Sequence, residues 1–357
     1  MKSLTITTQN TMSKSNKLKI LLLSSGGPGA SGVIKSLKKS NSKNFIFLGC
    51  DADSYAQNKN YLESFFVVPK RKHEKKYIKA IEKIYFENNI DLIYPLSSDD
   101  ITIFINHSND VDKSVINSLV KFKNSYSILI DKFKTYEKIK DTHFCPKYKV
   151  FKNKESFKEY FEKNKKDVLY AKPRVSSGSR GNFLIKQETS ISDYMMKKGC
   201  NIIEIEAFAK INGIDFSEYI FCEYLPGIEF SIDVFSDQGK LLNSCIRERT
   251  KVKGGISHVA KVIVNEDLEK LSAEICKIFK IDGAANIQFK KSKKGEYKLI
   301  EVNPRTSGTI CVATEAGVNI VDLVIRKFLG LEYKKIYPKK SKELTMIRYI
   351  EEFYLND

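Results

Sequence analysis

Hydrophobic residues in the first third of the chain form short runs that alternate with stretches of helical spacing. The runs KILLLSS (19–25), NFIFLGC (44–50) and DLIYPL (91–96) predict buried strands, and residues 73–89 carry apolar positions spaced as in a helix. Strands that alternate with helices favour a parallel sheet. We therefore expect a Rossmann-like α/β domain over residues 17–127, after a polar tail at 1–16 that we expect to be disordered.

The remaining two thirds of the chain change character. Residues 127–140 predict a short strand that runs into a helix opening near Asp131, and residues 168–186 predict a hairpin whose turn is rich in glycine and hydroxyl groups. From residue 222 strands dominate, with helices predicted at 267–279 and within 317–330. We expect a small domain over 128–221 and an α+β domain with a mixed sheet over 222–357.

A polar hairpin near the C-terminal end, QFKKSKKGEYKLIEVNPR (288–305), is the most informative segment. Strand alternation places Leu299, Glu301 and Asn303 on one face, with Gln288 available from the partner strand. An isolated pattern of this kind is usually a solvated face. Here a turn of small residues follows directly, and carboxylate and amide oxygens are the ligands that Mg²⁺ prefers. Arg305 follows within reach, as a planar cation suited to phosphate or carboxylate.

Composition limits the classes of function. The formal net charge is +18, which raises nucleic-acid binding as an alternative. The excess is Lys spread along the whole chain, and we do not expect a nucleic-acid partner. Seven scattered cysteines without metal-ligand spacing favour reduced thiols in a cytoplasmic protein. No run of 18 apolar residues occurs, so we expect no membrane span.

A glycine-rich turn follows the first predicted strand. Gly27, Gly29 and Gly32 form G-x-G-x-x-G, and Asp51 ends the next strand, as in a dinucleotide fingerprint. Two interpretations stay open from these residues: a bound dinucleotide, or a tight strand-to-helix turn in a domain that binds another molecule.

Further polar segments suggest a nucleotide site elsewhere. Lys172 offers a point charge for phosphates, and the flexible loop that follows it offers backbone N–H donors. The candidate phosphate-binding residues of this loop are Ser177, Gly178 and Ser179. Lys132 opens a predicted helix and is a second phosphate candidate. An acidic turn follows, with the candidate residues Glu223, Tyr224, Leu225 and Glu229. Backbone groups of this turn suit the edge of an adenine ring, and a carboxylate such as Glu229 suits ribose hydroxyls. The alternatives are an ordinary mobile hairpin and a structural turn.

Taken in order, these elements resemble the ATP-grasp superfamily, and within it the large subunit of carbamoyl-phosphate synthase and related carboxylate–amine ligases. The resemblance covers residues 17–330 and rests on IDK, YAKP, the glycine loop, EYLPG-x-E and N-x-Q…E-x-NPR. It implies that Lys132 and Lys172 hold ATP phosphates, and that the 223–225 turn binds adenine. It further implies that Glu229 binds ribose and that the metal ligands are Gln288, Glu301 and Asn303.

By this resemblance the chain is a cytoplasmic ligase that activates a carboxylate as an acyl phosphate and joins it to an amine. It implies ATP, one or two Mg²⁺ ions with Mn²⁺ as an alternative, and small-molecule acid and amine substrates. Many relatives have Glu at the position of Gln288, so the ion count stays open, as does homodimer formation. We hypothesise that Arg247 or Arg249 grips the acid while Arg305 stabilises the transferred charge. The alternatives are an NAD-dependent oxidoreductase using Gly27–Gly32 and a basic, non-catalytic nucleic-acid-binding protein.

Overall fold

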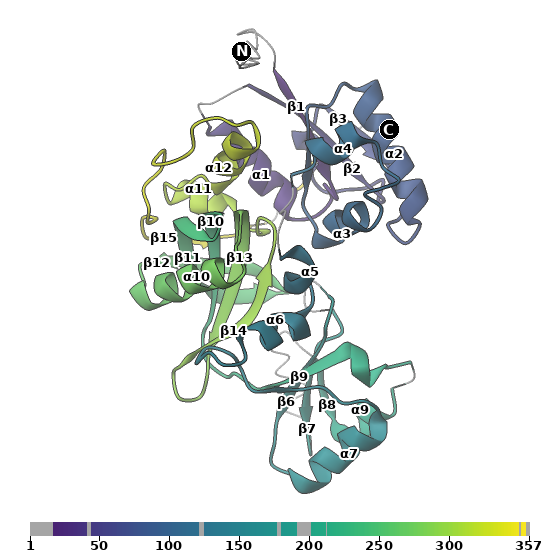
Figure 1. Cartoon of the computed structure of the whole chain (residues 1–357), viewed down its shortest axis with the longest axis vertical. Helices are drawn as coiled ribbons and strands as arrows, with labels where there is room; N and C mark the ends of the chain where they lie inside the picture. Colours follow the sequence, from purple (N-terminus) through teal and green to yellow (C-terminus); the bar gives the residue numbers. More distant parts are fainter. Residues whose placement is uncertain are drawn as a thin grey trace, which may run out of the picture.

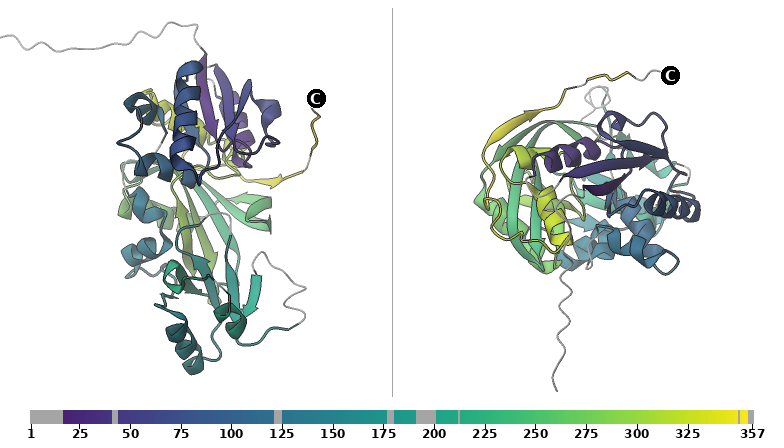
Figure 2. Two further views of the ribbon diagram at one scale, coloured as in Figure 1. Left: turned by 90° about the vertical axis from the view of Figure 1, so that its right-hand side faces the viewer. Right: turned by 90° about the horizontal axis from the view of Figure 1, so that it is seen from above.

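The computed structural model describes residues 17–40, 44–120, 125–176, 180–190, 201–211, 213–349 and 351–354. Three sheets follow one another along the long axis of the molecule (Figures 1 and 2). The first sheet lies at one end, the second at the other, and the third between them. This order agrees with the α/β class and the α+β C-terminal half expected from the sequence.

The first sheet is parallel throughout, in the order β3-β2-β1-β4. Its strands are β1 (Leu18–Leu23), β2 (Phe45–Asp51), β3 (Ser64–Val67) and β4 (Leu92–Pro95). Alternate residues of β1 enter two different cores: Ile20 and Leu22 pack toward the first helix, and Leu21 and Leu23 toward the helices on the other face. These helices are α1 (Gly29–Lys38), then α2 (Glu74–Glu87), α3 (Ser98–Asn106) and α4 (Lys113–Ser118), and a short 3₁₀ turn, η1 (Lys59–Tyr61), precedes β3.

The second sheet has the order β5-β9-β6-β7-β8. It consists of β5 (Tyr148–Lys149), β6 (Leu169–Pro173), β7 (Phe183–Lys186), β8 (Asn201–Glu204) and β9 (Tyr219–Glu223), with α7 (Lys154–Lys163), α9 (Ile205–Ala209) and η2 (Phe216–Glu218). Its core is a cluster of aromatic rings around Phe157, which contacts Phe208 and Phe221. Aromatic burial of this extent gives a small domain its own core.

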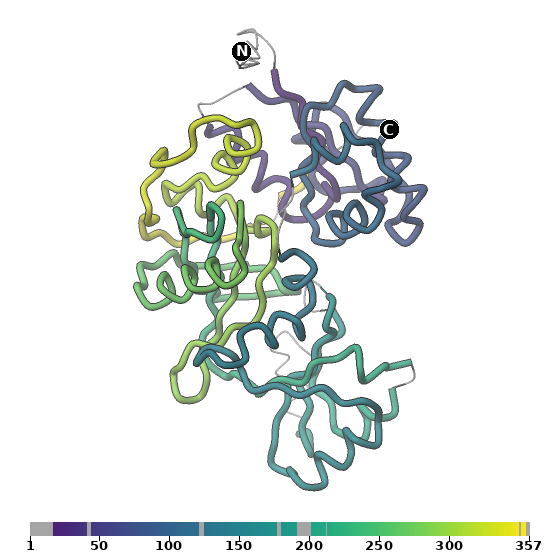
Figure 3. Tube along the Cα trace, in the orientation of Figure 1, coloured from purple at the N-terminus to yellow at the C-terminus, as the bar shows by residue number. Residues whose placement is uncertain are grey.

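The third sheet has the order β14-β13-β10-β11-β12-β15. It is formed by β10 (Glu229–Asp237), β11 (Lys240–Lys253), β12 (Ile256–Ile263), β13 (Gly283–Lys291), β14 (Tyr297–Asn303) and β15 (Leu344–Ile347), with α10 (Glu266–Ile278), α11 (Cys311–Glu315) and α12 (Ile320–Phe328). One face packs on α10, and the other packs on α12 and on α1 of the first domain. The chain after α12 follows the edge of this sheet to β15 (Figure 3).

Two short helices follow the first domain along the chain and pack against the third sheet. The predicted strand at the start of 127–140 is wrong: Tyr126–Leu129 forms helix α5, and Lys132–Ile139 forms α6 with Asp131 as its N-cap, as expected. The apolar residues of both helices join the core of the third sheet. The segment 126–139 therefore packs on the C-terminal sheet, and the aromatic core of the small domain is built from residues after it.

Candidate active site

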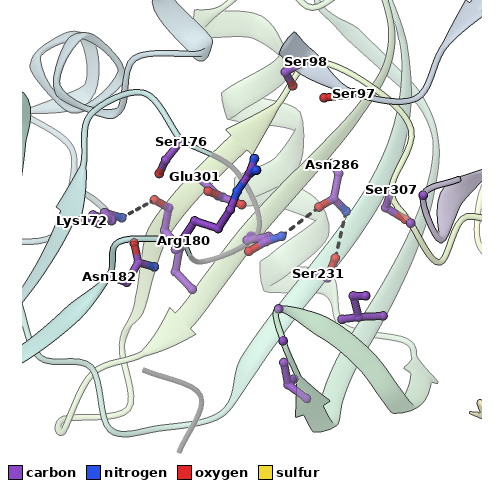
Figure 4. Close-up of a pocket in the computed structure, with 18 of the residues that line it drawn as sticks. Ser97, Ser98, Lys172, Ser176, Arg180, Asn182, Ser231, Asn286, Glu301 and Ser307 are labelled. Carbon is purple, nitrogen blue, oxygen red and sulfur yellow. Dashed lines mark hydrogen bonds between the residues drawn. The ribbon is translucent and has the colours of Figure 1, made fainter. Parts of the chain in front are cut away.

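A cavity of about 1440 Å³ opens where the three sheets approach one another. The first domain lines it with the turns after β1, β2, β3 and β4, the second sheet with β6 and β9, and the third with β10, β13 and β14. Figure 4 shows Ser97 and Ser98 of the first domain on one side, Lys172 on another, and Glu301, Asn286 and Ser231 along the third sheet. This volume exceeds that of a typical site for one small molecule.

The polar face of the β13–β14 hairpin brings Gln288 of one strand beside Glu301 of the other, as expected. Gln288 lies directly opposite Glu301, and Asn286 lies opposite Asn303. A β-bulge follows between Gln288 and Phe289, so Leu299 pairs with Phe289 and enters the hydrophobic core. The regular alternation predicted from Leu299 to Glu301 is therefore interrupted by an extra residue, although Leu299 and Glu301 both line the cavity.

The bulge has a consequence for Lys172. It leaves Ile300 without a partner across the ladder, and the Ile300 carbonyl accepts hydrogen bonds from Lys172 Nζ at 2.9 Å and from the Tyr136 hydroxyl at 2.7 Å. Lys172 Nζ also donates to the Tyr136 hydroxyl at 2.8 Å. The buried ammonium is thus held in one place beside the cavity.

Lys132 lies at the first position of α6 and is also buried. Its Nζ donates to the Ser176 carbonyl at 2.9 Å, which ties α6 to the loop after β6. Burial lowers the pKa of Lys132. The negative charge of Glu301 raises this pKa in part, and the positive charge of Lys172 lowers it further. The predicted loop residues Ser177, Gly178 and Ser179 lie outside the described residues.

Glu301 is the carboxylate at the centre of this cation-rich region. Burial raises its pKa, but the charge of Lys132, a hydrogen bond from Asn303 and the charges of Lys172 and Arg305 outweigh that effect, so the pKa lies below its ordinary value. Asn303 Nδ2 donates to Glu301 Oε1 at 2.7 Å, and Arg305 Nη2 donates to Asn303 Oδ1 at 3.3 Å. The carboxylate is therefore ionised at neutral pH.

The donor set of this face fits a hard cation. Gln288 Nε2 donates to Asn286 Oδ1 at 3.1 Å, which leaves the Gln288 side-chain oxygen for another partner. Within the described residues, no three His, Cys, Asp or Glu side chains gather as a metal cluster. One carboxylate beside amide oxygens suits Mg²⁺, which keeps several positions for water and phosphate.

The predicted adenine turn lies at the end of β9. Glu223, Tyr224 and Leu225 all line the cavity. The Glu223 carboxylate accepts a hydrogen bond from the Lys147 backbone N–H at 2.8 Å. This bond fixes the turn to the residue just before β5, the strand that pairs with β9. The nearby lining is largely apolar and includes Tyr136, Leu184, Ile202, Cys222 and Leu299. This end of the cavity suits a flat apolar ring.

Glu229 and Arg249 form an ion pair with each other, and both line the cavity. Arg249 also donates from Nη2 to the Gly255 carbonyl at 2.6 Å and from Nε to Ser257 Oγ at 3.1 Å. Its guanidinium therefore holds the tip of the β11–β12 hairpin, where Gly254 and Gly255 both have positive φ. Two consecutive residues in this conformation match a two-residue hairpin turn.

Arg247 lies beneath the cavity and does not line it. Its side chain is fully buried, and its Nη2 is 2.6 Å from Asp233 Oδ2 and also donates to Ser231 and Ser307 hydroxyls. This position does not fit the hypothesis that Arg247 grips the acid. Arg249, the alternative contact for the acid, lines the cavity and fits that hypothesis better, and Arg305, expected to stabilise the transferred charge, also lines it.

The glycine-rich turn after β1 also faces the cavity, through Gly27 and Gly29. Asp51, the acidic residue of the fingerprint, accepts hydrogen bonds from the backbone N–H groups of Gly26 at 2.9 Å and Asp53 at 3.1 Å. The carboxylate that would bind a ribose in a dinucleotide site therefore closes the turn itself. This observation favours the interpretation as a tight turn.

Several lining residues were given no role from the sequence, among them Asn286, Ser231 and Tyr136. Asn286 had a readable signal, because it lies two residues before Gln288 and so on the same strand face. Its Nδ2 donates to Ser231 Oγ and to Asp233 Oδ1, each at 2.9 Å. Ser231 and Tyr136 come from distant elements and carried no local signal.

The fold is the one found in ATP-grasp proteins of known structure. N5-carboxyaminoimidazole synthetase from Staphylococcus aureus aligns over 93% of this chain and 83% of its own, with a TM-score of 0.63 and 14% identity. Biotin carboxylase from Campylobacter jejuni aligns over 88% of this chain and 72% of its own, with a TM-score of 0.65 and 16% identity. L-amino acid ligase from Bacillus licheniformis aligns over 89% and 75%, with a TM-score of 0.58 and 15% identity.

The sequence agrees with the fold. Residues 215–353 match the family described as ATP-grasp in the biosynthetic pathway with Ter operon. The carbamoyl phosphate synthase large chain of Clostridium beijerinckii is 30% identical over 188 residues, which are 49% of this chain and 16% of that protein. The C-terminal part of the chain therefore matches an ATP-grasp family model, and the predicted ATP-grasp fold is confirmed. Each helix in the described part of the chain is too short or too polar to cross a lipid bilayer.

Proposed function

We propose that the chain is an ATP-dependent ligase that activates a carboxylate as an acyl phosphate and joins it to an amine, with release of ADP and phosphate. The observation that carries this proposal is the grouping of one ionised carboxylate, amide oxygens and buried cations in one cavity. Glu301, Lys132, Lys172 and Arg305 all line it. The volume of about 1440 Å³ accommodates a nucleotide together with a second substrate.

The proposed reaction begins with the attack of one anion on another. A substrate carboxylate oxygen attacks the γ-phosphorus of ATP, the bond to the β,γ-bridging oxygen breaks, and ADP leaves. The site must neutralise the charge that builds up on the phosphoryl oxygens. Lys132 and Lys172 suit the phosphates, and Arg305 suits the transferred group. Bound Mg²⁺, held by Glu301 and Gln288 with Asn303, would neutralise further phosphate charge.

The second step joins the two substrates. An amine attacks the acyl carbon, phosphate leaves, and the nitrogen loses a proton. Acyl phosphates react with water, so the site must exclude it. Residues from all three sheets line the cavity, which supports this requirement. Arg249, pinned by Glu229 and the hairpin tip, is the proposed contact for the acid, and Glu229 is the proposed contact for ribose.

Hydroxylamine trapping tests this proposal. We expect wild-type protein with Mg²⁺-ATP to form a hydroxamate with one member of a panel of acids, and Glu301→Gln to lose at least about a hundredfold in kcat/KM, as when a group that stabilises transition-state charge is removed. Glu296→Gln is the matched control, because Glu296 is an exposed carboxylate in the turn of the same hairpin. Equal activity of Glu301→Gln and Glu296→Gln would contradict the proposal.

Three finer predictions accompany the proposal. The metal is one or two Mg²⁺ ions, with Mn²⁺ as an alternative; the compartment is the cytoplasm; and the oligomeric state, including a homodimer, is left open. Neither alternative function gains support from a specific contact. The Asp51 carboxylate is engaged by its own turn, which disfavours an NAD site at Gly27–Gly32.

A further inference from the structure

The charges that line the cavity exceed the needs of one nucleotide and one carboxylate. Among the residues that the structure describes, ten cationic side chains line it: Lys70, Arg71, Lys72, Lys132, Lys172, Arg180, Lys186, Arg249, Lys290 and Arg305. Five carboxylates of the same described residues oppose them: Asp51, Asp53, Glu223, Glu229 and Glu301. ATP with Mg²⁺ and a simple monocarboxylic acid would leave cationic groups of the first domain without an anion.

The excess is concentrated in one segment. Lys70, Arg71 and Lys72 follow one another between β3 and α2, on the side of the cavity formed by the first domain. The predicted phosphate and metal residues come from α6, β6, β13 and β14, on other elements. A cationic segment on a separate wall is therefore suited to a part of the second substrate and not to the triphosphate.

Arg71 is already compensated and fixed. Its Nη1 donates to Ser97 Oγ at 2.8 Å and lies 3.3 Å from Asp99 Oδ2 and 3.6 Å from Asp100 Oδ1. Within the described part of the chain, no ion pair is formed by Lys70 or Lys72, and both side chains are exposed toward the cavity opening. The uncompensated charge of this wall therefore lies on the two lysines.

Two acidic residues on the same wall, Asp51 and Asp53, are held by backbone groups. Asp51 accepts hydrogen bonds from two backbone N–H groups, and Asp53 Oδ1 accepts one from the Tyr55 backbone at 2.9 Å. Within the described residues, neither carboxylate forms an ion pair with Lys70 or Lys72.

We propose that the acid substrate carries a second anionic group, a carboxylate or a phosphate, which binds to Lys70 and Lys72 while the reacting carboxylate lies at Arg249. This inference rests on the proposed function and narrows its substrate to dianionic acids. Two cationic regions on separate elements of the cavity lining would hold both ends of such an acid and orient the reacting oxygen. An acid with one anionic group would bind to only one wall.

A binding experiment tests the subsite independently of turnover. Protein saturated with Mg²⁺ and a non-hydrolysable ATP analogue is titrated by calorimetry with inorganic phosphate, and separately with malonate, at constant ionic strength. We expect one equivalent to bind to wild type and K70A/K72A to weaken binding by about tenfold or more, as for lost charged hydrogen bonds. The tighter of the two probes identifies the kind of second anion.

The matched control is K75A/K76A, because these two exposed lysines lie on the first turn of α2 and outside the cavity lining, and their loss changes the net charge equally. We expect this variant to bind both probes as wild type does. Equal weakening in the two double variants, or no binding by wild type, would overturn the inference.

A kinetic experiment separates this inference from the proposed function. Matched acids are compared in the hydroxylamine assay: butyrate with succinate, and glycerate with 3-phosphoglycerate. We expect hydroxamate only from the dianionic member of a pair, with KM raised and kcat kept in K70A/K72A. Equal kcat/KM for a monoanionic partner would refute the inference and leave the ligase proposal intact. A protein that binds no ATP analogue would instead refute the proposed function.

Discussion

Replacement of Arg247 by Met is the prediction that follows most directly from the packing. Arg247 and Asp233 are at most 1% exposed, and Arg247 Nη2 lies 2.6 Å from Asp233 Oδ2. The substitution leaves the Asp233 carboxylate in the interior with hydrogen bonds from Asn286 and Ser307 only. Breaking a buried ion pair by removal of one partner costs about 3–5 kcal/mol.

A loss of this size is measurable by thermal unfolding. At roughly 2–4 °C per kcal/mol for a large domain, we expect Arg247→Met to lower Tm by roughly 6–20 °C. Lys251→Met is the control, because Lys251 is exposed on the same strand, and we expect it to leave Tm nearly unchanged. Adding Asp233→Asn to Arg247→Met should recover part of the loss, since no buried charge then remains unpaired.

The reasoning would be refuted if Arg247→Met melted within about 2 °C of wild type. It would also be refuted if the double variant were less stable than Arg247→Met. Either result would mean that the buried ion pair does not stabilise the sheet beneath the site. The hypothesis from the sequence, in which Arg247 contacts the acid, would then be open again.

Three further predictions concern charge at and near the site. Lys132 helps to keep the pKa of Glu301 low, so in Lys132→Met the loss of Mg²⁺-ATP binding on acidification should move to higher pH; an unchanged midpoint in a binding titration from pH 4 to 7 would contradict this. Burial raises the pKa of Asp100 to about 6. As pH rises from 4 to 7, the folded wild type therefore keeps a proton that the unfolded chain has already released, and its free energy of unfolding falls. Asp100→Asn has no such group, so the stability of this variant minus that of wild type should increase by up to about 3 kcal/mol over this range, measured by urea unfolding; a difference that stays constant with pH would contradict this. Gln288→Glu places a second carboxylate opposite Glu301 and should lower the Mg²⁺ concentration needed for half-maximal ATP binding; an unchanged requirement would count against a metal at this face.

The sequence alone predicted the elements that depend on local pattern. Three strands of the first sheet (β1, β2 and β4), the helix that opens at Asp131 and the polar hairpin with Gln288 and Glu301 on different strands follow from hydrophobic periodicity, capping chemistry and strand alternation. The strand predicted at 127–130 failed because a short apolar run suits a helix and a strand equally, and contacts with the third sheet decide between them.

Other features of the site depend on the fold. The bulge that moves Leu299 into the core has no mark in an alternating pattern. The burial of Arg247 depends on Asp233 in a neighbouring strand and on Ser307 after another, which sequence spacing does not bring together. The strands β3 and β15 were not predicted, because each has only four residues, and so short a segment gives no clear alternation of apolar and polar positions.

Thermal stability with Mg²⁺-ATP is the measurement that tests the central claim most directly. We predict that Mg²⁺-ATP at about 100 times its Kd adds roughly 2.7 kcal/mol of stability to wild type and to Glu296→Gln. We predict that this gain disappears in Glu301→Gln and when Mg²⁺ is removed with EDTA. A shift with NADH and none with Mg²⁺-ATP would contradict the account and place the nucleotide at the glycine-rich turn of the first domain.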